Sequence, residues 1–176
     1  MKSSKSANHG LCARRGFTLL ELLVVMAIIG VLVGLLLPTI WKMKDRSRIV
    51  EASSDVNQIA AAWNHYLIDN RRFPEDSITE MGTNAVAILR GDSNPRGFRY
   101  LDLREITGYF CDPWGAPGTS NGVYRVRLDD DLDNIVEYPL AGGGTTNMPY
   151  HVIVWSIGPD RISGTGDDIG SWAKGK

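Results

Sequence analysis

Hydrophobic residues are spread very unevenly along this chain, and the strongest feature is an unbroken apolar run near its start. The run from Phe17 to Ile40 reads FTLLELLVVMAIIGVLVGLLLPTI, and Glu21 is its only charged residue. At 1.5 Å per residue, a helix of this length spans roughly 36 Å. Because the hydrocarbon core of a bilayer is about 30 Å thick, the run is long enough to cross a membrane.

A second pattern begins beyond Pro38, where apolar residues recur at intervals of three and four, as in an amphipathic helix. These residues are Ile49, Ala52, Val56, Ile59, Ala60, Trp63 and Leu67. Asn70 to Pro74 should end the helix, since proline disfavours helical backbone in the residue before it. Pro38 should bend or loosen the helix because it has no backbone N–H. The pattern predicts one rod of about 50 residues, with Trp63 and Tyr66 in a core rather than in a binding stripe.

The rest of the chain predicts a small head. A short helix is expected around Ala85 to Arg90, and a second short helix or extended piece over Leu101 to Thr107. Residues 124 to 128 alternate between apolar and basic, as in a half-buried strand. We expect Ile135 to Tyr138 to be its partner strand. Tyr150 to Ile157 is predicted as the third and most apolar strand, after a flexible glycine connection. The predicted fold class is α+β, a long N-terminal helix packed on a small antiparallel sheet.

Charge divides the chain further. It has 19 Lys and Arg against 20 Asp and Glu, for a net charge of −1. Residues 1–16 hold four basic residues and no acid, so the remainder is acidic. An acidic body argues against nucleic-acid binding, so no such partner is expected. Cys12 and Cys111 are too far apart for a CxxC redox pair or a metal knuckle.

The flanks of the apolar run predict its orientation. Arg14 and Arg15 should keep the N-terminus cytoplasmic and place the head on the far side. The basic residues on the other flank weaken this inference, although acidic residues accompany them there. A secretory signal peptide is disfavoured, because the run is longer than the usual 7–15 residues and Pro38 to Trp41 is a poor cleavage site.

Glu21 is unusual because a carboxylate within an apolar span is costly and usually has a partner. One interpretation is that Glu21 lies one turn inside the helix and extends to the lipid headgroups, helped by the positive end of the helix dipole.

The residues around Glu21 support a second interpretation. Arg15 to Glu21 reads RGFTLLE and closely resembles the processing motif of type IV prepilins and type II secretion pseudopilins. The resemblance covers Gly16, Phe17, Thr18, Leu19, Glu21 and the apolar tail, with Pro38 where that family bends its helix. It implies that prepilin peptidase cuts between Gly16 and Phe17 and methylates the Phe17 amine. The new ammonium is then expected to pair with Glu21 of a neighbouring subunit, since an unpaired charge in an apolar filament core is costly.

Two further stretches resemble major pseudopilins of type II secretion: Arg72 to Pro74 and Cys111 to Pro117. From the residues alone, Asp112 to Gly115 is a tight turn with a buried Trp114 and no chemistry. The resemblance implies four segments. They are a cytoplasmic leader (1–16) that is removed, a transmembrane and filament-core helix (17–40), an amphipathic second half of the helix (41–71), and a periplasmic α+β head (72–176).

The function implied by the resemblance is structural. The protein would be a single-pass protein of the bacterial inner membrane that polymerises with itself into a periplasmic pseudopilus driving protein export. Its implied partners are other pseudopilins, the inner-membrane secretion machinery and prepilin peptidase. Two alternatives stay open: a type IV pilin for adhesion, motility or DNA uptake, and a single-pass anchor carrying a calcium-binding module. The short head, the Asp112 to Gly115 turn and the acidic C-terminal loop favour secretion. The absence of a C-terminal cysteine pair removes the disulfide loop typical of many adhesive pilins.

The loop from Ser156 to Ile169 is a candidate calcium site, because calcium takes six to eight oxygens in irregular geometry. A solvated turn is the alternative. The loop resembles the calcium loop of major pseudopilins, which implies side-chain oxygens from Asp160, Thr165 and Asp167. It also implies carbonyl oxygens from Ile157 and Ile162, with Asp168 as an outer or additional ligand. Arg161 departs from the glycine often found after the first aspartate in that family.

Other candidate chemistry is weak. Asp129 to Asp133 fails the EF-hand pattern, because Asn134 replaces the required glycine, and is expected to be a solvated turn. The histidines are His9, His65 and His151, and no HExxH, nucleophile elbow or phosphate loop accompanies them. Cys111 is expected to be a partly buried structural residue. The chain is therefore not expected to be an enzyme.

Overall fold

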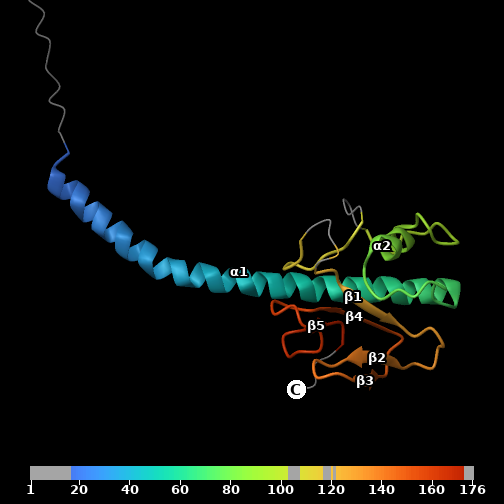
Figure 1. Ribbon diagram of the computed structural model, residues 1–176. Helices are drawn as coiled ribbons and strands as arrows, with labels where there is room; N and C mark the ends of the chain where they lie inside the picture. The colour runs from blue at the N-terminus through green and yellow to red at the C-terminus, as the bar shows by residue number, and fades with distance from the viewer. Residues whose placement is uncertain (1–16, 103–107, 117–119, 121, 173–176) are drawn as a thin grey trace, which may run out of the picture. The chain divides into compact units, whose positions relative to one another are not determined.

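The two helical patterns of the sequence form one continuous helix, α1, over Leu19–Asn70 (Figure 1). The structure is a computed structural model, and it describes residues 17–102, 108–116, 120 and 122–172, apart from the side chains of residues 38 and 39. The helix has 52 residues, so the predicted rod is confirmed. It ends where Arg71 adopts left-handed backbone (φ 62°) while its N–H still donates to the Leu67 carbonyl oxygen (2.7 Å).

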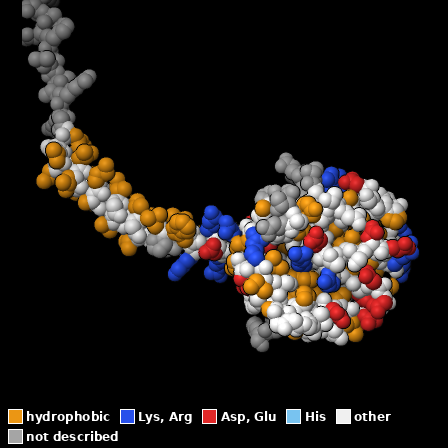
Figure 2. Space-filling model, viewed as in Figure 1, with side chains coloured by type: hydrophobic (Ala, Val, Ile, Leu, Met, Phe, Trp, Pro, Cys, Tyr) orange, Lys and Arg blue, Asp and Glu red, His pale blue; other side chains and the backbone are white. Residues whose placement is uncertain are grey.

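The chain divides into two compact units, residues 1–43 and residues 44–176. In the first unit, all side chains from Phe17 to Leu37 are exposed. Figure 2 shows this part of α1 covered by hydrophobic side chains. The predicted leader, residues 1–16, lies outside the described residues. It includes Gly16, after which cleavage is predicted.

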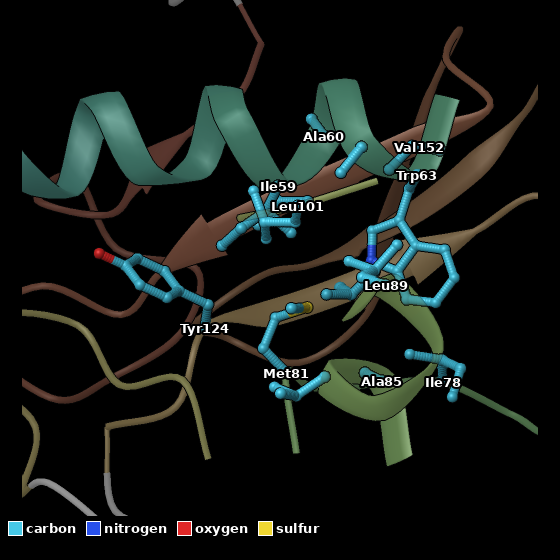
Figure 3. Packing of buried hydrophobic residues seen from close by; sticks show 14 of the residues in the cluster. Ile59, Ala60, Trp63, Ile78, Met81, Ala85, Leu89, Leu101, Tyr124 and Val152 are labelled. Atoms are coloured by element: carbon cyan, nitrogen blue, oxygen red, sulfur yellow. The ribbon is translucent and has the colours of Figure 1, made fainter. Parts of the chain in front are cut away.

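The second unit has its own hydrophobic core, built around the second half of α1. Figure 3 shows Ile59 and Trp63 of α1 directed toward Leu89 of a second helix, α2 (Thr83–Arg90). Trp63 and Tyr66 are buried, as predicted. Gly91 ends α2 with φ 96°, where a Cβ would come within 2.9 Å of the Gly97 carbonyl oxygen. The predicted short helix is confirmed. The predicted element over Leu101 to Thr107 falls largely outside the described residues.

The described residues of the head also form five short strands: β1 (Arg125–Leu128), β2 (Val136–Pro139), β3 (Thr145–Met148), β4 (Val152–Ser156) and β5 (Ile169–Gly170). They form a three-stranded antiparallel sheet in the order β1-β4-β5 and a separate antiparallel hairpin of β2 and β3. In the larger sheet, Val126 lies opposite Val154 and Trp155 lies opposite Gly170. The α+β fold predicted from the sequence is confirmed.

The predicted pairing of the strand at 135–138 with the strand at 124–128 is wrong. β2 pairs with β3, and β1 pairs with β4. Gly143 and Gly144 have φ of 84° and 89°, so the glycine run is a tight turn that joins β2 to β3. Left-handed residues of this kind match the twist of a hairpin.

β4 is apolar throughout because both of its faces are covered. Val152 and Val154 belong to the core that includes α1 and α2. Ile153 and Trp155 belong to a smaller cluster that includes Tyr138 of β2. The end of β4 therefore leads into the C-terminal loop from a rigid, buried strand.

Candidate functional site

Thr18 and Glu21 form a reciprocal set of hydrogen bonds at the start of α1. The Thr18 N–H and hydroxyl both donate to Glu21 Oε2 (2.9 Å each), and the Glu21 N–H donates to Thr18 Oγ1 (3.2 Å). This is a capping box, in which a threonine and a glutamate three residues later satisfy two unpaired donors of the first turn. Sequence reasoning missed this contact, although the T-x-x-E spacing could have revealed it.

The side chains of the apolar segment of α1, from Phe17 to Leu37, are exposed. Phe17 is 75% exposed and Leu19 is 81% exposed. Within the described residues, α1 is the helix that is long and apolar enough to cross a membrane. Exposure of such a continuous apolar surface requires lipid or other protein around it.

The C-terminal loop brings four of the five predicted metal ligands together through their hydrogen bonds. The Asp167 carboxylate accepts from the Asp160 N–H (3.3 Å) and from the Thr165 hydroxyl (2.5 Å). The Thr165 hydroxyl also lies 3.1 Å from the Ile162 carbonyl oxygen. Carboxylate, hydroxyl and carbonyl oxygens thus converge, and these are the donors that calcium prefers.

Gly158, which follows the fifth predicted ligand Ile157, lies beside the same carboxylate. Its backbone is left-handed (φ 67°), and a Cβ at this position would lie 2.8 Å from both the carbonyl oxygen and Oδ2 of Asp167. Only glycine permits this approach. Ile157 is buried, and it joins β4 to the loop.

The two neighbouring aspartates of the loop differ electrostatically. The Thr165 hydroxyl and the Asp160 N–H hold the pKa of Asp167 below its usual range. Burial raises the pKa of Asp168, against hydrogen bonds to its Oδ2 from the Tyr138 hydroxyl and the Gly164 N–H. Asp168 Oδ1 is buried and has no hydrogen-bond partner among the described residues. An orphaned carboxylate oxygen beside this donor set fits a bound cation, because buried polar atoms are otherwise paired.

A second acidic group lies in the loop after β1, where carboxylate oxygens of Asp129, Asp131 and Asp133 come within 4.8 Å of one another. The prediction of a solvated turn is wrong for Asp129, which is 2% exposed. Its carboxylate accepts from the backbone N–H groups of Asp133 (3.1 Å) and Asn134 (2.8 Å) and contacts His151 Nδ1 (2.6 Å). Burial acts against ionisation, but these hydrogen bonds prevail and lower the pKa of Asp129. These contacts give Asp129 a structural role in closing the loop.

The segment at 111–115 forms the predicted tight turn. The Gly115 N–H donates to the Asp112 carbonyl oxygen (2.8 Å), with Pro113 at the second position. Trp114 is only partly buried, rather than buried as predicted, and packs against the main core. Cys111 is partly buried, and its Sγ lies 3.5 Å from the Ala116 carbonyl oxygen. His65 is exposed on α1.

Known proteins resemble this chain both in its N-terminal segment and over nearly its whole length. Residues 11–37 match the family model described as the prokaryotic N-terminal methylation motif. The type II secretion system core protein G of Klebsiella pneumoniae is 31% identical over 163 residues, which cover 93% of this chain and 97% of that protein. The protein of the same name from Dickeya chrysanthemi is 32% identical, over 92% of this chain and 88% of that protein.

The protein of that name from Pseudomonas aeruginosa is 29% identical, over 89% of this chain and 94% of that protein. No solved structure matches the chain significantly. The matches to core protein G extend over nearly the full length of both chains, so they include the α+β head as well as the N-terminal motif. The chain belongs to the family of type II secretion system core protein G.

Proposed function

We propose that this protein is the structural subunit of a type II secretion pseudopilus, which polymerises into a periplasmic filament that drives protein export. The observation that carries this proposal is the apolar surface of α1 from Phe17 to Leu37, which is exposed on every described side chain. A filament built from such helices covers that surface with other copies. The end-to-end similarity to core protein G favours secretion over adhesion or a solitary anchor.

Processing comes before assembly in this proposal. A prepilin peptidase hydrolyses the peptide bond between Gly16 and Phe17 and methylates the Phe17 amine. The methylation motif matched over residues 11–37 supports this step. Before the cut, the leader with Arg14 and Arg15 holds the N-terminus in the cytoplasm and the head in the periplasm. The protein is thus a single-pass protein of the inner membrane.

Glu21 has two partners in succession. In the structure its carboxylate is bound by Thr18, which keeps the charge satisfied within one chain. In the filament, the ammonium of Phe17 from a neighbouring copy compensates the same carboxylate, and this pairing sets the axial position of one helix against the next. The function lies in assembly, and no catalytic role is assigned.

Replacement of Glu21 tests this role. Glu21→Ala in the full chain should abolish or strongly reduce filaments at wild-type expression, as seen by electron microscopy of sheared fractions. Glu137→Ala removes an exposed acid of β2 and serves as the matched control. Normal filaments from Glu21→Ala would contradict the assigned role.

We also propose that the C-terminal loop binds calcium. Asp160 and Asp167 would supply charge, Thr165 a hydroxyl, and Ile157 and Ile162 carbonyl oxygens, with Asp168 able to add its orphaned Oδ1. Bound calcium would join the loop to β4 and the head in place of a disulfide, and so stabilise the folded state. Isothermal titration of the full chain in detergent with calcium chloride tests this: saturable binding is expected, and no heat above dilution would overturn it.

A further inference from the structure

We propose that Arg161 pins the C-terminal loop to the turn at Asp112–Gly115, and that this contact holds the loop in its calcium-binding form before calcium arrives. The inference rests on the proposed calcium site, but it concerns a side chain outside the ligand set.

The guanidinium of Arg161 is inserted against the turn. Its Nη1 is buried and has no hydrogen-bond partner among the described residues. A Cβ built on Gly122 would lie 2.3 Å from this nitrogen, 2.5 Å from Gly115 Cα and 3.0 Å from Asp112 Oδ1. The arginine therefore occupies space that only a glycine at 122 leaves open, next to the turn and to the buried Asp112 carboxylate.

The Asp112 carboxylate places negative charge near this nitrogen. A buried cation is costly unless an opposite charge lies near it. Asp112 is 3% exposed and is the acidic residue of the turn. Its Oδ2 accepts from the Ser156 hydroxyl (2.6 Å) and its Oδ1 from the Trp114 N–H (3.2 Å), so the carboxylate is fixed in place. In this proposal, electrostatic attraction between the Arg161 guanidinium and the Asp112 carboxylate helps to hold the loop against the turn.

The backbone of Arg161 is unfavourable for an arginine. Its φ is 63°, in the left-handed region where residues with a Cβ are disfavoured and glycine is not. A glycine at this position would relieve the backbone cost. The proposal therefore requires the packing of Arg161 Nη1 against Gly122 and the turn to offset this backbone cost.

The proposed contact of Arg161 with the turn affects the proposed calcium ligands directly. Asp160 and Ile162 flank Arg161, and the Ile162 N–H donates to Asp160 Oδ1 (2.8 Å). At the start of the loop, Ser156 binds the same Asp112 carboxylate and accepts from the Gly158 N–H (3.1 Å). The loop is thus held on the turn at two points, 156 and 161. Apparent affinity increases with the fraction of molecules whose loop is already in the binding form. A loop held in that form before binding therefore binds calcium more tightly.

Arg161→Gly in the full chain in detergent tests the inference, with Arg96→Gly in the exposed loop after α2 as the matched control. Calcium chloride titration should give a Kd about tenfold higher for Arg161→Gly, an effect equal to about 1.4 kcal/mol. The calcium-free melting temperature should also fall. Arg96→Gly should change neither quantity. Arg161→Asn, which also tolerates left-handed backbone, should behave as Arg161→Gly does, and it replaces that variant if the glycine chain fails to fold.

A result that contradicts the inference would differ in both the melting temperature and the Kd of Arg161→Gly. If the guanidinium holds nothing, Arg161→Gly relieves the backbone cost, so the calcium-free melting temperature rises and the Kd stays unchanged. That outcome would overturn the inference. If the wild-type chain binds no calcium at all, the calcium proposal itself fails, and with it the claim that the loop is held for a metal. The calcium-free melting temperature of Arg161→Gly then tests separately whether Arg161 holds the loop against the turn.

Discussion

Thr18 and Glu21 close the first turn of α1 on each other, with Thr18 donating two hydrogen bonds to the Glu21 carboxylate and receiving one from the Glu21 N–H. The charge that appears isolated within the apolar run is therefore satisfied by its own chain. This matters for a segment that must first reside in lipid, where an unpaired carboxylate is costly. The same carboxylate lies at the end of the helix where the proposed cleavage would create the Phe17 amine.

Loss of the Thr18 hydroxyl should impair assembly. Thr18→Ala removes a cap worth about 0.5–2 kcal/mol and leaves the Glu21 carboxylate with fewer partners in the membrane. We expect fewer filaments at equal protein level, measured by electron microscopy and quantitative immunoblotting of sheared fractions. Thr18→Ser keeps the hydroxyl and should assemble normally. Equal yields from Thr18→Ala and Thr18→Ser would show that the capping contact is unimportant.

The head depends on the buried face of α1. Ile59→Ala removes a side chain that is fully buried and should cost about 2–5 kcal/mol of unfolding free energy. Ile68→Ala changes the same residue type on the same helix, but Ile68 is 66% exposed, so its effect should be small. Urea denaturation of both variants, followed by tryptophan fluorescence, measures the difference. Similar costs for the two variants would mean that α1 does not pack on the head through this face.

Asp55 should make stability depend on pH. Its carboxylate, on α1, is half-buried and accepts from the hydroxyl of Tyr124, the residue before β1 (2.7 Å). Burial raises the pKa of Asp55 above its ordinary value of 3.8, although the Tyr124 hydrogen bond opposes the change. A raised pKa in the folded state favours folding below the unfolded value, and this contribution is lost as pH rises through the folded pKa.

Asp55→Asn tests this dependence, because asparagine can accept the same hydrogen bond without titrating. The stability of the wild type relative to Asp55→Asn should fall as pH rises from 3.8 toward neutrality. Urea denaturation across that pH range measures the difference. A wild type that gains stability over Asp55→Asn as pH rises would contradict the raised pKa.

Calcium should stabilise the head through the C-terminal loop. At a calcium concentration about 100 times Kd, a ligand specific for the folded state adds about 2.7 kcal/mol. For a chain of this size that is a rise in melting temperature of about 5–10 °C. Trp155 donates its indole N–H to Ser163 Oγ in the loop (2.9 Å), so its fluorescence should report binding as well.

Two variants distinguish the loop from the other acidic group. Asp167→Asn should remove the difference in melting temperature between calcium and chelator, whereas Asp133→Asn should preserve it. If only Asp133→Asn removed the difference, the calcium site would lie in the loop after β1 instead.

The parts of the fold that follow from local pattern were predictable from the sequence. The apolar run and the three- and four-residue spacing after it correctly predict α1, and the apolar stretch at 150–157 correctly predicts β4. β3 reads Thr-Thr-Asn-Met and is almost fully exposed, so no hydrophobic alternation marks it. Without β3, the sequence offered the strand at 124–128 as the only nearby partner for β2, and the predicted pairing was wrong for that reason.

In the candidate site, too, some features were predictable from the sequence and others were not. The resemblance to major pseudopilins implied Asp160, Thr165 and Asp167 as ligands, and the structure brings these three residues together. Asp129 contacts His151, and Arg161 Nη1 lies against Gly122, in each case a residue distant in the sequence. Neither relationship has a local pattern, so the sequence gives no sign of it.

The intact mass of the protein purified from its native membrane tests the central claim most directly. If the chain is a pseudopilin subunit, the mass should equal that of residues 17–176 plus one methyl group on the Phe17 amine. A mass equal to that of the full chain, residues 1–176, would contradict processing and, with it, assembly through the Phe17 amine and Glu21.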